Sequence, residues 1–457
     1  MRYLIFTAVL FSMFFVCSFA AAQEGVARLI WSRPQDQQGI SPSASPNRMR
    51  LLPGNFRTTL LRSRKVPTPA KDGFVSLFNG KDLTGWTVKG GDAKYHVEDG
   101  CIVGVVNDTS RNTFLCTEKK YENFIFKAEF KFDKNFNSGI QFRSNARPDG
   151  DREVVYGYQC EMEPAGMTAA IYDEARRGRW LNVVTDELKE STMKPFKQGE
   201  WNELEIQCVG PSIRTWFNGQ PVTDIMDVMT DRGFFGLQVH AANSGQVRWR
   251  NIRIKELPAT PWKPFFNHED KKFVNLEIKP AGQWKFMEDG SVYATATSDE
   301  KRDGMVISKE VYDDFAVRIS FKQGKGNSGL YFRAHEIDAP HWTCGFQCEI
   351  DDFATGYLWE VGGGPSKGRG WVAPPDKENA KILKQDEWND ISTVAIDDRI
   401  VTNLNGWQVV EIVDPDCLKN GKTALQLHGG SDMEYWFKNY EIMPLNKEMV
   451  KLITRYH

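Results

Sequence analysis

The chain has 457 residues, of which 41% are hydrophobic and 26% charged, and its formal net charge is −2 at pH 7. This length exceeds what one hydrophobic core usually supports, and the composition is that of a globular protein, which excludes fibrous and wholly disordered classes. The small net charge gives no reason to expect nucleic acid or an anionic membrane surface as a partner.

The first residues are typical of an export signal. Arg2 precedes an apolar run from Tyr3 to Val16, and three alanines at 20–22 offer a small-residue cleavage site. The run is too short to cross a bilayer. We expect residues 1–22 to be a signal peptide and the protein to be secreted or periplasmic without a membrane span. A lipoprotein signal at Cys17 is the weaker alternative, because Val16 is not the small residue that such a site prefers.

Residues 23–72 are rich in Arg, Pro, Ser and Gln and have no sustained apolar period. Such a composition predicts a disordered linker. An amphipathic docking segment around Met49 to Leu61 is the weaker interpretation.

The cysteines after residue 22 are odd in number and include no C-x-x-C pair. This argues against a disulfide framework and against a zinc knuckle, so most of them are expected to be core thiols. Cys101 and Cys116 could form a local bridge if their strands are neighbours.

From residue 73 onward the sequence repeats itself. NSGIQFRS at 137–144 returns as NSGLYFRA at 327–334, and YQCEME at 158–163 returns as FQCEID at 346–351. The order of the matching phrases is kept, and the period is far too long for a solenoid. We interpret this as duplication of a whole domain, with copies at 73–257 and 264–445, a proline-rich seam between them and a tail at 446–457.

Each copy has the pattern of β-structure. Short alternating runs such as FIFKAEFKF and WNELEIQCV are separated by turn residues, and the Asn-Gly pairs at 218 and 405 are hairpin signals. No long amphipathic helix competes. The sequence predicts an all-β protein of two tandem antiparallel sandwiches.

Alternation along the strands predicts one polar face in each copy, because successive side chains point to opposite sides. In the first copy the side chains predicted to lie on the polar face are a cation, amides, carboxylates and an imidazole: Gln141, Arg143, Gln159, Glu161, Gln238 and His240. In the second copy it carries Arg333, Glu349 and His428. Such side chains can hold planar hydrogen bonds or move protons, which favours a ligand-binding face over an ordinary solvated face. A structural ion pair between Arg143 and Glu161 is the alternative.

Several motifs of the first copy resemble the 3-keto-disaccharide hydrolase domain family. They are F-x-S-L-F-N-G-K-D-L-x-G-W at 74–86, N-S-G-x-x-F-R at 137–143, G-Y-Q-x-E at 157–161, Y-D-E at 172–174 and G-L-Q-x-H at 236–240. That family is similar to concanavalin A-like lectins and glucanases, so the resemblance implies jelly-roll sandwiches. The second copy is divergent, since it loses the first of these motifs and Y-D-E.

The resemblance implies cleavage of 3-keto-glycosides by elimination and hydration, which needs a base, a donor for the enolate oxygen and an acid. His240 or Glu161 is the candidate base, Arg143 the enolate stabiliser, and Asp173 or Glu174 the second proton carrier. Amides and loop side chains are expected to contact the substrate: Gln141, Gln159, Tyr172, Arg176 and Gln238.

Two other functions fit the same residues. An ordinary glycosidase would use Glu161 and Glu174 as its two carboxylates. A non-catalytic carbohydrate-binding protein would use the second copy as its binding module. No metal is predicted to be required, although the carboxylates of the first copy could ligate Ca²⁺. The expected partner is a carbohydrate, and the oligomeric state does not follow from the sequence.

Overall fold

The computed structural model describes residues 72–109, 111–134, 136–338, 341–376 and 379–454. The predicted signal peptide, and the predicted linker except for Asp72, lie outside these residues. None of the helices in the described ranges is both long and apolar enough to cross a bilayer.

The first half of the chain forms two antiparallel sheets that face each other. The larger sheet has the order β12 (Gln220–Met226), β11 (Ser212–Phe217), β10 (Asn202–Val209), β6 (Phe124–Phe132), β14 (Ala242–Glu256), β4 (Cys101–Thr109) and β3 (Lys94–Glu98), with β1 (Val75–Ser76) beside β14. The second sheet has the order β2 (Trp86–Gly90), β5 (Thr113–Thr117), β13 (Phe234–Val239), β7 (Ser138–Asp149), β8 (Arg152–Met162) and β9 (Ile171–Glu174). A short helix, α1 (Asp186–Met193), follows β9 and is capped by the Thr185 side chain.

The second half repeats the strand order of the first and adds β26 at the edge of its second sheet and a separate two-stranded hairpin. Its larger sheet has the order β29 (Trp407–Val413), β28 (Arg399–Leu404), β27 (Asn389–Ile396), β22 (Asp314–Lys325), β31 (Met433–Leu445), β20 (Val292–Ala296) and β19 (Gln283–Phe286), with β15 (Lys263–Pro264) beside β31. The other sheet has the order β18 (Leu276–Ile278), β21 (Gly304–Ser308), β30 (Lys422–Leu427), β23 (Ser328–Glu336), β24 (Thr343–Ile350), β25 (Leu358–Val361) and β26 (Gly370–Ala373). The second half also contains a separate small hairpin of β16 (Phe266–Asn267) and β17 (Lys272–Phe273) and a 3₁₀ turn at Asn379–Ile382. The prediction of two tandem jelly-roll-type sandwiches is confirmed.

The core of each half lies between its two sheets. Strand β6 shows why: its residues alternate strictly between buried and half-buried, so Phe124, Phe126, Phe130 and Phe132 all point inward. Phe126 stacks on Phe235 of the opposite sheet with ring centroids 4.4 Å apart. Burial of each such side chain contributes about 1.5–3 kcal/mol, so the apolar parity of the strands drives the closure of the sandwich.

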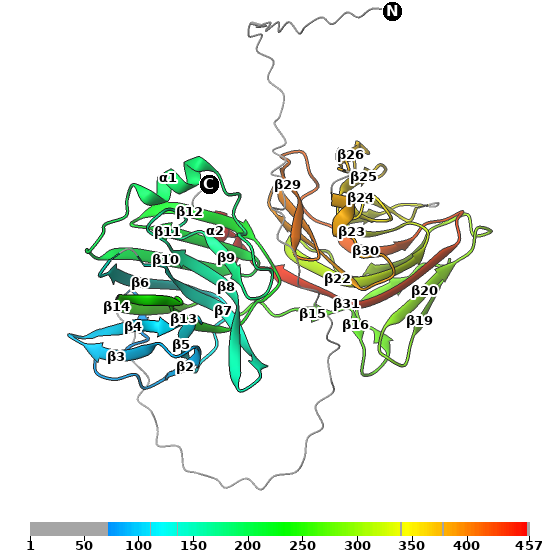
Figure 1. Cartoon of the computed structure of the whole chain (residues 1–457). Helices are drawn as coiled ribbons and strands as arrows, with labels where there is room; N and C mark the ends of the chain where they lie inside the picture. The colour runs from blue at the N-terminus through cyan, green and yellow to red at the C-terminus, as the bar shows by residue number, and fades with distance from the viewer. Residues whose placement is uncertain (1–71, 110, 135, 339–340, 377–378, 455–457) are drawn as a thin grey trace, which may run out of the picture.

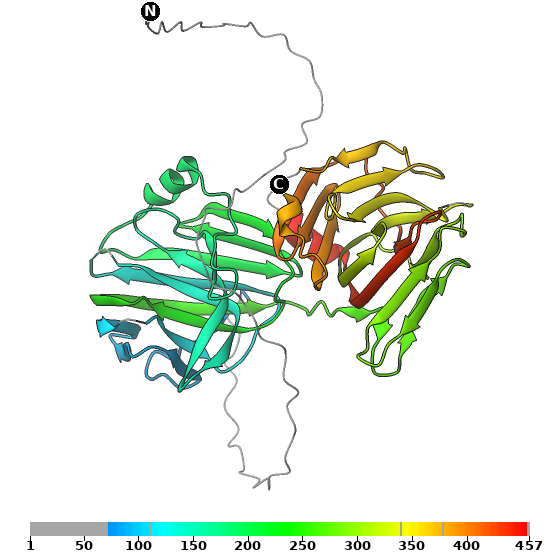
Figure 2. The same ribbon diagram turned by 45° about the vertical axis from the view of Figure 1, so that its right-hand side comes forward.

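The two halves lie side by side and share a third apolar cluster (Figures 1 and 2). Val209 and Met226 come from the first half, and Met443 comes from the second. The C-terminal helix α2 (Lys447–Thr454), in the segment predicted only as a tail, adds Met449 and Ile453 to this cluster and contacts β10. The halves are therefore packed together through an apolar cluster rather than joined only by the seam.

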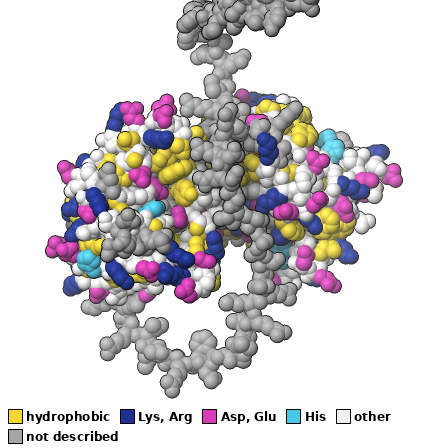
Figure 3. Space-filling model, viewed as in Figure 1, with side chains coloured by type: hydrophobic (Ala, Val, Ile, Leu, Met, Phe, Trp, Pro, Cys, Tyr) yellow, Lys and Arg dark blue, Asp and Glu magenta, His cyan; other side chains and the backbone are white. Residues whose placement is uncertain are grey.

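Charged groups extend this interface. Arg399 of the second half binds Asp224 of the first at 2.7 Å, and Arg179 of the first half donates to Gly406 O of the second at 2.6 Å. The Arg179 guanidinium also stacks on the Trp407 ring, 3.4 Å from its centroid. Elsewhere on the face shown in Figure 3, basic and acidic side chains are interspersed over both halves.

All seven cysteines of the described residues are free and buried. The suggested bridge between Cys101 and Cys116 is wrong, because Cys101 begins β4 of one sheet while Cys116 lies in β5 of the other. The division of the chain into domains at 73–257 and 264–445 stays a prediction.

Candidate functional site

The polar face lies on the outer side of the sheet that contains β13, β7, β8 and β9. The register places Gly139 opposite Glu161, Gln141 opposite Gln159, and Gln159 opposite Tyr172. Strands that the sequence suggested only separately are therefore neighbours in space. The β7–β8 hairpin continues beyond this region (Figure 1) and is tied to β2 by an ion pair between Lys89 and Glu153 at 2.6 Å.

Gly139 allows one amide to occupy the centre of the face. A Cβ atom at this position would lie 2.6 Å from Cγ and Cδ of Gln159, which is closer than atoms can pack. The Gln159 side chain therefore lies across Gly139, where its Nε2 donates to Glu161 Oε2 at 3.0 Å and to Gln238 Oε1 at 3.3 Å. The glycine of the repeated N-S-G phrase is thus a packing requirement of the site.

Glu161 is the most strongly perturbed carboxyl of this face. Only 4% of the residue is exposed. Burial raises its pKa from 4.5 to about 7, against the opposing effect of hydrogen bonds from Gln159 and from Asn137 Nδ2 at 2.7 Å, while the charges of Glu163 and Glu174 raise it further. A carboxyl with this pKa can both accept and return a proton near neutral pH.

Glu174 and His240 form the second part of the cluster. Asn112 Nδ2 donates to Glu174 Oε1 at 3.2 Å, and Asn112 Oδ1 accepts from the backbone N–H of Ala241 at 2.9 Å, which ties β9 to the end of β13. Burial raises the pKa of Glu174, while the charge of His240 acts in the opposite direction. His240 Nδ1 lies 2.9 Å from Ala241 O, a pure acceptor, so Nδ1 carries the hydrogen and Nε2 is available to take a proton.

Gln238 carries an unused donor within this cluster. Gln141 Nε2 donates to Gln159 Oε1 at 2.8 Å, and Ser144 Oγ donates to Gln141 Oε1 at 2.6 Å, so the chain of amides has a fixed direction. Because Gln238 Oε1 accepts from Gln159, its Nε2 faces away, and this buried atom has no hydrogen-bond partner among the described residues. Unpartnered buried donors are uncommon in proteins. A free donor beside titratable groups can instead donate a hydrogen bond to an oxygen of a bound ligand.

An aromatic pair stands at the edge of the face. Tyr172 projects from β9 on the same side as Glu174, and its ring contacts that of Trp180 edge-on, with centroids 5.2 Å apart. Both rings are half-buried. Aromatic surfaces of this kind can pack against the apolar side of a sugar ring.

The structure corrects the expected position of Arg143. A β-bulge after Phe142 interrupts the alternation, and Arg143 has φ 45°, so its side chain leaves the polar face. The guanidinium is 1% exposed and donates to Glu122 O at 2.8 Å, Gly210 O at 2.9 Å and Asn123 Oδ1 at 2.9 Å. Neither the predicted enolate contact nor the alternative ion pair with Glu161 is present.

Arg333 in the second half has the same conformation, with φ 46° after a register shift at Phe332. It is fully buried and donates to Asp397 O at 2.6 Å. The repeated arginine therefore serves the fold of both copies, and its predicted placement on the second polar face is also wrong.

Asp173 and Arg176 also lie away from the polar face. Asp173 is fully buried on the side of β9 opposite Tyr172 and Glu174, where Arg176 pairs with it at 2.7 Å. Arg177 bridges Asp173 and Asp227, the latter at 2.6 Å. An Asp173 carboxylate engaged by two arginines is poorly suited to proton transfer, so the expected catalytic role of Asp173 and the expected substrate contact of Arg176 are not supported.

The second half repeats this ion-pair network with other residues. Arg369 binds Glu360, which occupies the Asp173 position in β25, and also binds Asp414 at 2.6 Å. Because the network is present in both halves, it belongs to the sandwich rather than to the chemistry of one copy.

Two residues of the polar face were not among the candidates named from the sequence: Asn112 and Asn137. Asn137 belongs to the repeated N-S-G phrase and could have been found there, since its Nδ2 donates to Glu161 and to Glu163 at 2.8 Å. Asn112 lies in a turn before β5, and no sequence pattern pointed to it.

The corresponding face of the second half keeps some groups and loses others. Glu349 is buried and burial raises its pKa to about 7, and Gln347 Nε2 donates to Gln426 Oε1 at 3.2 Å. Val361 stands in the β25 position that corresponds to Glu174 in β9. Asp303 accepts from Gln426 Nε2 at 2.7 Å, so the donor that is free in the first half is satisfied here. His428 remains at the strand end but is exposed.

No group of three or more potential metal ligands occurs among the residues that the structure describes.

The family model of the 3-keto-alpha-glucoside-1,2-lyase-like domain matches residues 73–255 and again residues 261–443. A 3-keto-disaccharide hydrolase of Bacteroides thetaiotaomicron is 26% identical in an alignment that covers 44% of this chain and 84% of the relative.

Two Bacillus subtilis structures are also similar. A protein of unknown function with a galectin-like fold is 14% identical with a TM-score of 0.32, over 40% of this chain and 94% of that one. The carbohydrate-binding module CBM66 is 17% identical with a TM-score of 0.29, over 40% of this chain and 99% of the module.

Proposed function

The chain belongs to the 3-keto-alpha-glucoside-1,2-lyase-like family in both of its halves, and from this premise we propose that it cleaves the glycosidic bonds of 3-keto-glycosides by elimination followed by hydration. The family and the hydrolase named above support a glycosyl hydrolase-like function in general. The observation that carries the finer proposal is that Gln159 Nε2 donates to both Glu161 and Gln238, whose own amide nitrogen has no partner among the described residues. Glu174 lies close enough to Glu161 and His240 for their charges to interact.

The chemistry follows from the ketone. A carbonyl at C3 makes the C2 hydrogen acidic, so a base can remove it and leave an enolate at the C3 oxygen. Collapse of the enolate breaks the bond between C1 and the glycosidic oxygen, which leaves with a proton from an acid. Water then adds to the enone, with hydroxyl at C1 and a proton at C2, which returns a 3-keto-sugar. The site must supply a base, an acid and a donor for the enolate oxygen.

We assign these roles to the groups that converge on the polar face of the first half. Glu161 is the base, because a carboxyl with pKa about 7 is half-ionised at neutral pH and keeps enough basicity to take a carbon-bound proton. Gln238 Nε2 donates to the enolate oxygen in place of Arg143. His240, next to the Glu174 carboxylate, delivers the proton to the leaving oxygen through Nε2.

The second half is proposed to bind carbohydrate without cleaving it. It keeps Glu349 and Gln347 but has Val361 where the first half has Glu174, and the amide of Gln426 is already bound by Asp303. This face has no free amide donor for the enolate oxygen, and it lacks the carboxylate that stands beside the acid, His240, in the first half. The ordinary two-carboxylate glycosidase, with Glu161 and Glu174, is the competing assignment for the first half.

Export is part of the proposal. The predicted signal peptide at residues 1–22 lies outside the described residues, and we place the enzyme in the periplasm or outside the cell, where it would meet carbohydrate.

The test compares release of the leaving group from a 3-keto-glucoside and from the same glucoside without the ketone. Glu161→Gln is expected to lower turnover of the keto substrate at least about 100-fold, since general acid–base groups contribute about 10²–10⁴. Glu349→Gln is the matched control, because it changes a similarly buried carboxyl whose pKa is also raised to about 7 in the other half. Equal turnover of both glucosides would favour the two-carboxylate glycosidase, and turnover of neither would refute an enzyme of this class.

A further inference from the structure

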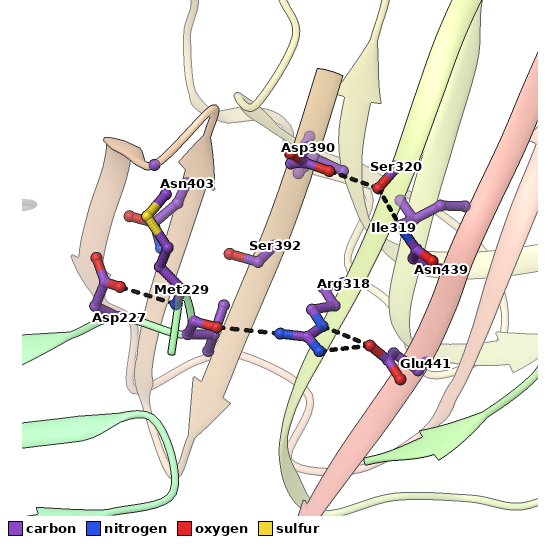
Figure 4. A pocket seen from close by; sticks show the side chains of 13 residues that line it. Asp227, Met229, Arg318, Ile319, Ser320, Asp390, Ser392, Asn403, Asn439 and Glu441 are labelled. Carbon is purple, nitrogen blue, oxygen red and sulfur yellow. Dashed lines mark hydrogen bonds and ion pairs between the residues drawn. The ribbon is translucent and has the colours of Figure 1, made fainter. Parts of the chain in front are cut away.

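A cleft of about 390 Å³ lies between the two halves (Figure 4), and its lining includes no residue of the proposed catalytic face. The second half contributes β22, β27, β28 and β31 as its floor, and the first half contributes the segment Asp227–Met229 as its rim. Its volume falls within the range of small-molecule sites, about 300–1,000 Å³, and equals the space of roughly a dozen waters. A hexose or a small disaccharide fits such a space.

The floor of this cleft contains a polar group that the protein itself does not satisfy. Asn403 is 6% exposed and lines the cleft, and its Nδ2 has no hydrogen-bond partner among the described residues. The Ser392 hydroxyl lies on the neighbouring strand beside it, and Figure 4 shows both side chains on the cleft floor. A buried amide donor left unpaired costs about 1–3 kcal/mol, and a ligand oxygen would recover that cost.

The charges around the cleft are largely balanced within the protein. Arg318 binds Glu441 at 2.6 Å and also donates to Val228 O at 3.1 Å, while Asp227 is paired with Arg177 at 2.6 Å. Asp390 accepts a hydrogen bond from the neutral hydroxyl of Ser320 at 2.5 Å.

The lining as a whole contains one arginine and three carboxylates. This excess of carboxylates disfavours phosphates and carboxylates as ligands, because the one arginine of the lining is already paired with Glu441. It suits a neutral molecule whose hydroxyls donate to Asp390 and accept from Asn403, because each hydroxyl can do both.

We propose that this cleft is a second binding site, for a neutral polyhydroxylated ligand such as a mono- or disaccharide, held by Asn403, Ser392 and Asp390 against the Asp227–Met229 rim. The site is separate from the catalytic face and needs neither the 3-keto group nor turnover. A ligand there touches both halves, so its binding also holds them together.

Binding is tested on the full chain by calorimetric titration with glucose and with cellobiose, and with glucose 6-phosphate as the charged comparator. Ser392→Leu fills the cleft and is expected to abolish binding, and Asn403→Asp replaces the donor by an acceptor of equal size and is expected to weaken it at least tenfold. Lys322→Ala is the control, because Lys322 lies further along β22, in a different hollow beside Trp436.

A fourth variant, Gln238→Ala, separates this site from the catalytic face. Retention of sugar binding in Gln238→Ala together with its loss in Ser392→Leu supports the cleft, as does a sugar-induced rise of the unfolding midpoint that both cleft variants lack. Absence of saturable binding to the wild type, binding that survives in both folded cleft variants, or tighter binding of glucose 6-phosphate than of glucose would each overturn the proposal. Circular dichroism of each variant establishes that it is folded, and the conservative Asn403→Asp change keeps the test valid if Ser392→Leu is not.

Discussion

Glu161 should make the stability of the first half depend on pH in a way that a single substitution removes. Burial raises its pKa in the folded state from 4.5 to about 7. Between these values the folded protein holds a proton that the unfolded chain releases, so the free energy of unfolding falls as the pH rises. The stabilising contribution is complete below pH 4.5 and is lost as the pH passes through about 7.

The size of the effect follows from the shift. One pKa unit corresponds to about 1.4 kcal/mol, so a rise from 4.5 to about 7 is worth about 3 kcal/mol, most of which is lost between about pH 5 and about pH 8. Glu161→Gln removes this titration. At about pH 8 the variant is expected to be about 2 kcal/mol more stable than the wild type, after deducting about 1 kcal/mol for an amide that faces the donors of Asn137 and Gln159.

The assay is urea unfolding of the full chain at several pH values, followed by tryptophan fluorescence. The wild type should lose about 2–3 kcal/mol more than Glu161→Gln between the two ends of the range. Glu349→Gln should show a similar difference in the second half while leaving turnover unchanged, and the two changes should add because they lie on sheets of different halves. Parallel pH profiles of the wild type and Glu161→Gln would refute the assignment of a buried, protonatable carboxyl at this position.

Three further changes test individual parts of the structure. Gly139→Ala should displace Gln159, which lies 2.6 Å from the added methyl group, and should lower turnover about tenfold or more. Gly329→Ala is the control, because it should disturb only the second half. Unchanged kinetics in Gly139→Ala would contradict the packing of the site. Arg143→Met should lower the free energy of unfolding by about 3 kcal/mol, because the three buried oxygens that accept hydrogen bonds from the guanidinium lose their donor. A loss of turnover at unchanged stability would instead indicate a catalytic role for Arg143. Trp407→Ala removes a cation–π contact of about 1–2 kcal/mol between the halves and should separate two transitions in scanning calorimetry, so an unchanged thermogram would argue against this contact as a brace.

The fold could be predicted from the sequence because its cause is local and repeated. Alternation in runs such as residues 124–132 assigns side chains to the core or to the outside without knowledge of the partner strand, and the repeat required a second sandwich with the same strand order. The amides and carboxylates at 159, 161 and 238 followed the same alternation and do lie on one face.

Where the alternation of side chains along a strand is interrupted, only the tertiary structure shows on which side of the sheet a side chain lies. The bulge after Phe142 gives Arg143 a positive φ and turns it into the fold, and no sequence period reports an extra residue in a strand. Asp173 and Glu174 lie on opposite sides of β9, and only Asp173 is paired with the arginines packed behind that strand. Asn112, the α2 helix in the interface and the cleft between the halves depend on contacts between distant segments, whose energies arise only when the chain has folded. The sequence by itself therefore determined which strands form and which side chains share a face, while the tertiary structure decided which of those side chains meet.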